Sequence, residues 1–215
     1  MNGAALVALI DRTLALLAEH ADELRDLDAA IGDGDLGFTV GKGCEAVRGR
    51  LAALADPTPA QIIKAAGASA ANANPSTMAA LVGGGLMAGG KAIGDADSLG
   101  RTESIALARA IAESIATRGK SAVGDKTILD AMVPSIDALE AAPAGSPGAA
   151  VLRAMVDAAR GGVEATTALQ NQRGRAAWLG ARSADHPDPG ATAYLRFLEA
   201  LLSARELQDR KPTGE

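Results

Sequence analysis

Three aspartates stand close together in the segment LDAAIGDGDLG, residues 27–37: Asp28, Asp33 and Asp35. Carboxylates at such short spacing repel one another unless a cation compensates their charge. Their hard oxygen atoms favour Mg²⁺ or Ca²⁺, and Mg²⁺ commonly combines one or two carboxylates with water and substrate phosphates. A nucleotide is therefore the natural co-ligand of a metal held by this loop.

The acidic loop also resembles three other kinds of loop. The G-x-G-x-x-G spacing of residues 32–37 matches a dinucleotide fingerprint, but it follows a predicted helix instead of a strand, and two aspartates would face the pyrophosphate. An EF-hand counted from Asp33 fails, because positions six and twelve are Phe38 and Cys44 instead of Gly and Glu. A solvated acidic turn that caps the next helix remains open.

Two further segments have residue types typical of phosphate sites. Residues 74–77, Asn-Pro-Ser-Thr, look like a helix start, where free N–H groups and the helix dipole attract anions; an ordinary N-cap is the alternative. Residues 85–92, GLMAGGKA, resemble a Walker A loop but end in Ala and lie inside an apolar helical run with no preceding strand. Close helix packing explains that run better.

The elements that position these residues are predicted to be helices. Hydrophobic residues make up 48% of the 215 residues and aromatic residues only 2%, so the core must consist of small aliphatic side chains, which favour packed helices over sheets. We expect an all-α fold of about eight antiparallel helices in an up-and-down bundle or barrel. The predicted helices cover approximately 6–27, 38–55, a segment from 58, 78–93, 101–117, 127–140, 147–171 and 190–208.

Length and composition limit the class of protein. We expect one domain over residues 1–207 and a frayed tail over 208–215. A net charge of −5 without a basic cluster argues against a nucleic-acid partner. The single Cys44 excludes an internal disulfide and suits a cytoplasmic protein. The N-terminal apolar run is interrupted at Asp11 and Arg12, and no window reaches the roughly 18 residues of a membrane span.

Four segments in matching order resemble the dihydroxyacetone kinase L-subunit family, which also forms the C-terminal domain of single-chain dihydroxyacetone kinases. They are LDAAIGDGDLG (27–37), ANPST (73–77), VGDKTILDAMVPSIDAL (123–139) and GRAAWLG…DPGATA (174–193). The resemblance implies an α-helical barrel that binds ATP or ADP at one end. It also implies that Asp28, Asp33 and Asp35 hold two Mg²⁺ ions that bridge the phosphates. The implied nucleotide-binding residues are Asn74, Ser76, Thr77, Gly119, Thr127, Ile128, Arg175, Asp188, Pro189 and Gly190.

The resemblance also implies a partner. In the family the ketose is bound covalently, through a histidine, by a separate K-type subunit or domain, so this chain is expected to be the incomplete half of a kinase for dihydroxyacetone or a related ketose. In one variant, tightly held ADP is a cofactor recharged by a phosphotransferase-system protein. A fatty-acid kinase branch, whose partner carries the lipid, and a non-catalytic regulator with the same fold remain alternatives, and a homodimer is a further candidate assembly.

Two departures from the family pattern concern the site. Leu36 stands where the family usually has His directly after the second loop aspartate, and residues 71–77 replace the usual GGASG-like phosphate segment. Both departures indicate a divergent branch, with a tetrulose or a branched pentulose as candidate substrates.

Overall fold

The structure, a computed structural model, describes residues 1–210, without the side chains of Arg175 and Leu179. Over these residues the chain forms helices joined by turns and loops, with no β-strand. The elements are α1 (Gly3–Ala18), α2 (Ala21–Ile31), α3 (Leu36–Ala52), α4 (Pro59–Ala73), α5 (Thr77–Ala92), α6 (Arg101–Gly119), α7 (Leu129–Ala141), α8 (Gly148–Thr166), the 3₁₀ segment η1 (Arg175–Ser183) and α9 (Pro189–Arg210).

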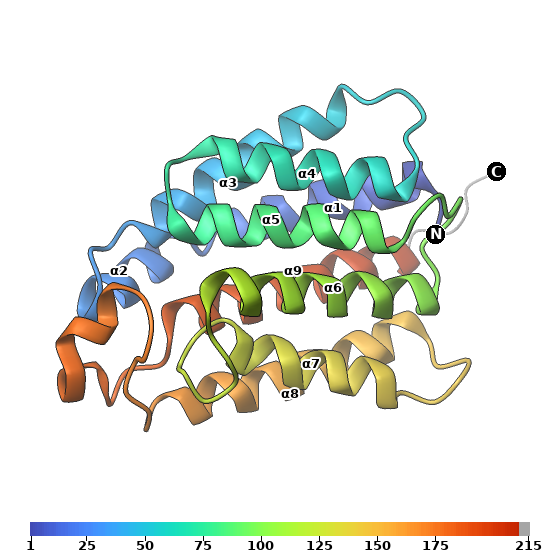
Figure 1. Cartoon of the computed structure of the whole chain (residues 1–215). Coiled ribbons are helices and arrows are strands. Elements are labelled where there is room, and N and C mark those ends of the chain that lie inside the picture. The colour runs from blue at the N-terminus through green and yellow to red at the C-terminus, as the bar shows by residue number, and fades with distance from the viewer. Residues whose placement is uncertain (211–215) are drawn as a thin grey trace.

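Eight of the helices in residues 1–210 form a closed ring. α1 packs on α3, the ring continues in order through α4, α5, α6, α7 and α8 to α9, and α9 returns to α1. Consecutive ring helices run in opposite directions (Figure 1). α2 lies at one end of the ring and packs on α3 and α9. The predicted all-α up-and-down barrel is therefore confirmed, with α2 as an additional helix.

The first predicted helix, over residues 6–27, is wrong in one respect: it is two helices, α1 and α2, separated by a turn at Glu19 and His20. The turn allows α2 to leave the direction of α1 and to bury Leu24 and Ile31. Apolar spacing continues across the turn, so periodicity alone did not indicate the break. The helix predicted over 147–171 also ends early, at Thr166 of α8, and a long loop follows.

Glycines allow the neighbouring helices α4, α5 and α6 to approach closely. A Cβ atom added to Gly83 of α5 would lie 2.6 Å from the carbonyl oxygen of Gly67 in α4. A Cβ added to Gly89 would lie 2.5 Å from a methyl group of Leu107 in α6. The Gly-rich run 85–92 is therefore part of α5 and serves close packing, as the sequence indicated.

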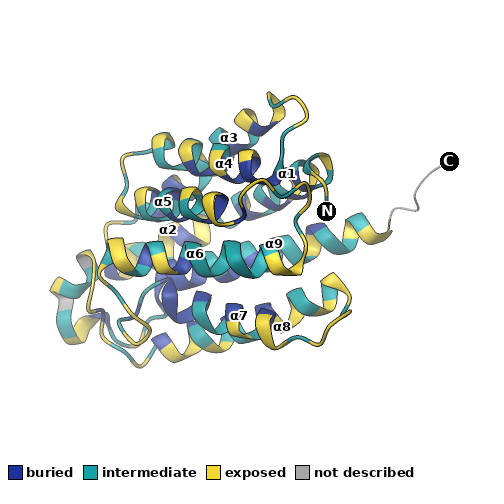
Figure 2. Ribbon diagram, turned by 45° about the vertical axis from the view of Figure 1, so that its right-hand side comes forward, coloured by how far each residue is buried: buried dark blue, intermediate teal, exposed yellow. Residues whose placement is uncertain are grey.

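Buried residues lie mainly on the helix faces that turn toward neighbouring helices, and exposed residues lie on the outer faces and loops (Figure 2). The buried apolar residues are chiefly Leu, Ile, Val and Ala, as the composition required. None of the helices in residues 1–210 has an apolar stretch suited to crossing a bilayer. α9 continues to Arg210, and the remainder of the tail predicted over 208–215 lies outside the described residues.

Candidate metal and nucleotide site

The alternating direction of the ring helices brings the N-termini of α3, α5, α7 and α9 to one end of the barrel, on the left in Figure 1. We call this the site end; its loops are residues 32–35, 74–76, 120–128 and 167–188. The first N–H groups of a helix have no partner within the helix, and the helix dipole places about half a positive charge there. The site end therefore favours anions, and all four family-like motifs reach it.

Asp28, Asp33 and Asp35 meet where α2 passes into α3. One carboxylate oxygen from each residue lies within 4.8 Å of the others. Asp28 and Asp35 are half-buried and Asp33 is exposed. Asp28 Oδ2 accepts a hydrogen bond from the backbone N–H of Leu36 at 3.3 Å. Burial, with a contribution from the charge of Asp28, raises the pKa of Asp35. The structure thus brings together the three aspartates that the sequence singled out.

Glycines shape the acidic loop. A Cβ added to Gly32 would lie 2.4 Å from Asp28 Oδ1, so a larger residue would displace this carboxylate. Gly34 has a φ of +73°, a left-handed conformation that glycine adopts without strain. A Cβ added to Gly37 would lie 2.0 Å from the carbonyl oxygen of Ala21, so Gly37 permits the close contact between α2 and α3. The loop glycines therefore set the distances between the carboxylates.

The residues present fit a divalent cation with oxygen ligands. Three carboxylates offer hard oxygen atoms of the kind that Mg²⁺ prefers, and their mutual repulsion favours a cation between them. Asp35 occupies the N-cap position of α3, yet its side chain makes no capping hydrogen bond. A side-chain hydrogen bond to the start of α3 is therefore not the role of this carboxylate.

The start of α5 lies beside the start of α3. Asn74 Nδ2 donates a hydrogen bond of 2.8 Å to Thr39 Oγ1 and so joins the end of α4 to the first turn of α3. Ser76 is the N-cap residue of α5 but makes no side-chain capping hydrogen bond, and Thr77 is exposed. The predicted phosphate segment thus leaves the first N–H groups of α5 without a side-chain cap, close to the acidic loop.

Other residues predicted to bind the nucleotide meet around the first turns of α5. A Cβ added to Gly190, in α9, would lie 2.7 Å from Met78 Cε and 3.6 Å from the backbone nitrogen of Ile128. A Cβ added to Gly119, at the end of α6, would lie 3.6 Å from a methyl group of Leu81 in α5. The starts of α5, α7 and α9 and the end of α6 therefore form one continuous region.

Asp188 lies beneath this region. It is 6% exposed, its Oδ2 accepts a hydrogen bond from the N–H of Ala191 at 2.8 Å, and its own N–H donates to Thr166 Oγ1 at 2.9 Å. Burial raises the pKa of Asp188 to about 6. The carboxylate therefore stabilises the start of α9 from inside. The side chain of Arg175, also predicted to contact the nucleotide, lies outside the described part of the structure.

Comparison with known proteins shows which family the chain resembles. The DAK2 domain matches residues 30–203, which include Asp33, Asp35 and the three later motifs. The chain belongs to the DAK2 domain family. The resemblance to the dihydroxyacetone kinase L-subunit family is thereby confirmed.

Members of the DAK2 family and related structures cover most of this chain. The "PEP-dependent dihydroxyacetone kinase, ADP-binding subunit DhaL" of Escherichia coli is 30% identical over 203 residues, which are 94% of this chain and 97% of that protein. The D-erythrulose kinase of Mycolicibacterium smegmatis is 36% identical over 214 residues, 96% of this chain but 35% of that protein. A crystal structure of the dihydroxyacetone kinase from C. freundii in complex with AMP-PNP and Mg²⁺ has a TM-score of 0.74 and 25% identity, and the match covers 93% of this chain and 34% of that one.

Leu36 differs from the His expected at this position of a DAK2 domain. Leu36 is the first residue of α3 and is 5% exposed. The side chain is thus buried, and the residue contributes its backbone N–H to Asp28. At the position where a His was expected, this chain therefore has a buried apolar side chain.

Sequence reasoning missed buried polar residues that lie next to the candidate site. Asp130 Oδ1 accepts a hydrogen bond from the N–H of Gly124 at 2.6 Å, and Oδ2 accepts one from the N–H of Thr127 at 2.7 Å. Lys126 and Asn171 are buried as well. The available signal was Lys126 and Asp130 beside the apolar residues of the third motif, because charged residues are seldom buried without partners.

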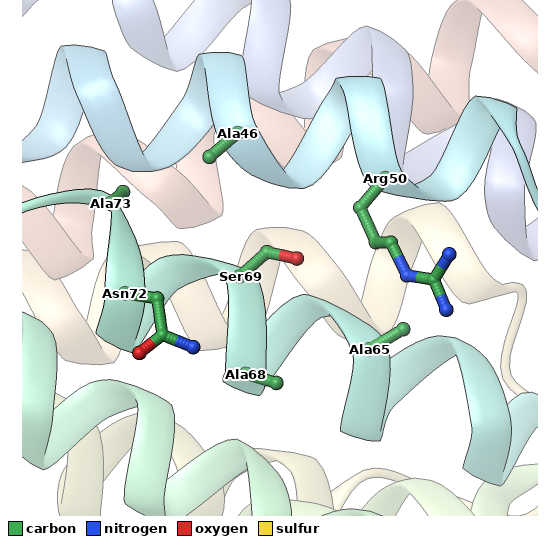
Figure 3. A pocket seen from close by; sticks show the side chains of 7 residues that line it. All are labelled: Ala46, Arg50, Ala65, Ala68, Ser69, Asn72 and Ala73. Carbon is green, nitrogen blue, oxygen red and sulfur yellow. The ribbon is translucent and has the colours of Figure 1, made fainter.

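A groove outside the DAK2 site lies between α3 and α4 (Figure 3). Its volume is about 390 Å³, and its lining residues are small apart from Arg50: Ala46, Ala65, Ala68, Ser69, Asn72 and Ala73. None of the three aspartates lines it, and none of its polar lining side chains is buried. The groove therefore adds nothing to the metal site.

Proposed function

We propose that this chain is the nucleotide- and magnesium-binding component of a kinase whose substrate is a small ketose, dihydroxyacetone or a related sugar, held by a separate K-type subunit. The observation that carries the proposal is the meeting of three carboxylate oxygens within 4.8 Å at the barrel end where four helix N-termini gather. The names of the relatives support it: one is an ADP-binding subunit, and one structure contains AMP-PNP and Mg²⁺. In this proposal residues 1–207 act as one domain.

The proposed division of labour follows from the chemistry of phosphoryl transfer, which requires mainly positioning and neutralisation of charge. Asp28, Asp33 and Asp35 would hold Mg²⁺, two ions in this proposal, and the bound metal supplies neutralisation of the phosphate charge. The N–H groups of the first turn of α5, beginning at Thr77, would bind phosphate oxygens, because the Ser76 side chain does not cap them. No nucleophile from this chain is required.

The base and ribose would lie over the region where α5, α6, α7 and α9 meet. Met78 and Ile128 bring apolar surface there, and the glycines at 119 and 190 permit close contact between the elements. Thr127, Arg175 and residues 188–190 complete the proposed pocket. Asp188 would contribute by fixing the start of α9 rather than by an exposed carboxylate.

Calorimetric titration with ADP and with ATP, each with and without Mg²⁺, tests the proposal. The sample must first be shown to be free of retained nucleotide. Binding that requires Mg²⁺ is the expected result, because the three carboxylates repel phosphate unless a cation lies between them. If neither ADP nor ATP binds in the presence of Mg²⁺, the proposal is contradicted.

The same preparation distinguishes two phosphoryl donors. A relative named as PEP-dependent and ADP-binding favours ADP held as a cofactor, whereas a related structure that contains AMP-PNP, an analogue of ATP, favours ATP as the donor. ADP that copurifies and exchanges slowly would support the first version, together with a phosphotransferase-system protein. Nucleotide binding without transfer to any ketose-loaded K-type subunit would instead support a regulator.

Exposed apolar side chains at the site end predict where the K-type subunit docks. Trp178 of η1 is 91% exposed and Phe38, in the first turn of α3, is 59% exposed. Large aromatic residues commonly dominate interfaces, so Trp178→Ala and Phe38→Ala should each weaken binding of the K-type subunit about tenfold or more. Leu207→Ala, an exposed apolar residue near the opposite end of α9, is the control.

Binding of the K-type subunit is measured by calorimetry with the ketose-loaded protein. ADP affinity should stay unchanged in the Phe38 and Leu207 variants, which separates docking from nucleotide binding. Wild-type affinity for the K-type subunit in both aromatic variants would show that docking uses another face.

A further inference from the structure

Lys126 is a buried lysine in the loop between α6 and α7, with 1% of its surface exposed. Its Nζ donates hydrogen bonds to three backbone carbonyl oxygens: Leu169 at 2.9 Å, Ser183 at 2.6 Å and His186 at 2.7 Å. All three acceptors belong to the loop 167–188. Leu169 lies near the beginning of the loop, Ser183 at the end of η1, and His186 near the end of the loop. One side chain therefore holds this loop at three separated points.

The chemistry of this contact requires a lysine. Three carbonyl oxygens arranged around one point need three N–H donors from one atom, and only an ammonium group provides them. Burial lowers the pKa of Lys126, while the carboxylates of Asp188 and Asp185 oppose this effect. The backbone of Lys126 has a φ of +61°, a left-handed conformation unusual for a residue other than glycine. Lys126 thus combines a strained backbone conformation with a buried amino group.

Apolar burial does not hold the loop. Among the side chains described in residues 167–187, the buried ones are Asn171 and Ser183, and both are polar. Polar contacts hold the loop instead. Asn171 Nδ2 donates a hydrogen bond of 3.0 Å to the carbonyl oxygen of Lys126, and the backbone N–H of Gln172 donates one of 3.0 Å to the carbonyl oxygen of Asp125. Residues 125–126 therefore hold the loop from the side of α7, in addition to bonds within the loop and to the packing of η1 on α2.

We propose that Lys126 is a positioning residue: by holding the loop 167–188 through three carbonyl oxygens, it shapes the part of the site that receives the base and ribose of the nucleotide. This inference rests on the proposed function. Lys126 lies behind the site and acts through the loop, which carries Arg175 and leads into residues 188–190, whereas the metal-binding aspartates belong to other elements. Loss of the ammonium group should therefore affect the base and ribose end and spare the phosphate end.

Lys126→Met tests this role, with Lys120→Met as the matched control. Lys120 is exposed, lies in the same interhelical loop and also has a left-handed backbone, at φ +51°, so both variants lose one positive charge from similar positions. In Lys126→Met, trypsin should cleave after Arg173 and Arg182 at least about tenfold faster, because three carbonyl oxygens lose their partner. Circular dichroism should show unchanged helix content.

Ligand binding then separates a positioning role from a merely structural one. In Lys126→Met the affinity for Mg-ADP should fall about tenfold or more, whereas the affinity for Mg-pyrophosphate, which lacks base and ribose, should stay within about twofold of wild type. Lys126→Arg keeps a cation in the same place and should recover part of the protection from trypsin. Lys120→Met should resemble wild type in all these measurements.

Each other outcome would overturn the inference. Unchanged cleavage in Lys126→Met would show that the loop does not depend on the ammonium group, and global unfolding would show that the effect is not local. Faster cleavage with unchanged ADP affinity, or equal losses for ADP and pyrophosphate, would disconnect the loop from the base and ribose. If the wild-type chain binds no ADP, the proposed function fails, and with it the role in the site; the cleavage rates would then report on loop order alone.

Discussion

Asp35→Asn is expected to lower the affinity for Mg-ADP by at least about 100-fold, because groups that merely support a metal ligand already contribute about 10- to 100-fold. Asparagine keeps the shape of the side chain but removes the charge that a cation requires. Asp33→Asn should have a similar effect, since its carboxylate lies within 4.8 Å of the other two. Calorimetric titration of each variant with ADP at saturating Mg²⁺ measures the loss.

The same substitution should not destabilise the fold in the absence of metal. Burial and Asp28 raise the pKa of Asp35, so the folded chain binds this proton more tightly than the unfolded chain does. The contribution of Asp35 to stability therefore decreases as pH rises through the ordinary and the raised pKa, and at neutral pH its charge disfavours folding. Asp35→Asn removes that cost, and its melting temperature without Mg²⁺ should equal or exceed that of wild type.

Asp26→Asn is the control for charge. Asp26 precedes the triad by two residues, is exposed and pairs with Arg25 at 2.9 Å. Because exposed ion pairs contribute little, this variant should bind Mg-ADP as wild type does. Unchanged Mg-ADP affinity in both Asp33→Asn and Asp35→Asn would remove the metal site from these residues.

Gly37→Ala is the second substitution with a large expected effect. The added methyl group would lie 2.0 Å from the carbonyl oxygen of Ala21 and 2.8 Å from Arg25 Cβ, so α2 and α3 would have to separate. Overpacking of this kind costs about 1–3 kcal/mol, and each kcal/mol corresponds to about 2–4 °C in melting temperature for a protein of this size. Since Asp28 is on α2 and Asp35 precedes α3, the affinity for Mg-ADP should fall as well.

Gly41→Ala is a control on the same helix, one turn further on. A Cβ added to Gly41 has no atom within 4 Å, so alanine should stabilise α3 by about 0.4–1 kcal/mol through its higher helix propensity. Thermal unfolding and ADP titration of both variants give the comparison. Equal melting temperatures for the two variants would mean that the contact between α2 and α3 is not close in solution.

The meeting of the three carboxylates in the candidate site could be predicted because they are local in sequence. Asp28, Asp33 and Asp35 lie in one segment, and repulsion between adjacent carboxylates is a signal that needs no knowledge of the fold. The ring of helices was predictable from composition and periodicity. Ala-rich segments with few aromatic residues and with apolar residues at helical spacing leave few alternatives to a helical bundle or barrel. The glycines of α5 were also interpreted correctly, since no strand precedes them.

The remaining features depend on contacts between residues distant in sequence. The turn at Glu19 and His20 has no glycine or proline to mark it, and α2 is held in its place partly by Arg196 of α9, which pairs with Glu23 at 2.9 Å. Lys126 finds its three acceptors between 43 and 60 residues away, on a loop without an apolar pattern. Such partners are backbone carbonyl groups, which leave no trace in the sequence.

The exposed indole of Trp178 on η1 provides an intrinsic fluorescence signal from the site end. Trp178 is the single tryptophan of the sequence, and the single tyrosine, Tyr194, is partly buried with its hydroxyl 2.7 Å from Ser135 Oγ. Fluorescence excited selectively in the indole band therefore comes from one position at the site end. Solvent around an exposed indole shifts its emission to long wavelength, and a protein surface that covers it shifts the emission back. Arrival of the proposed K-type subunit could thus be timed in a stopped-flow instrument without attaching a dye.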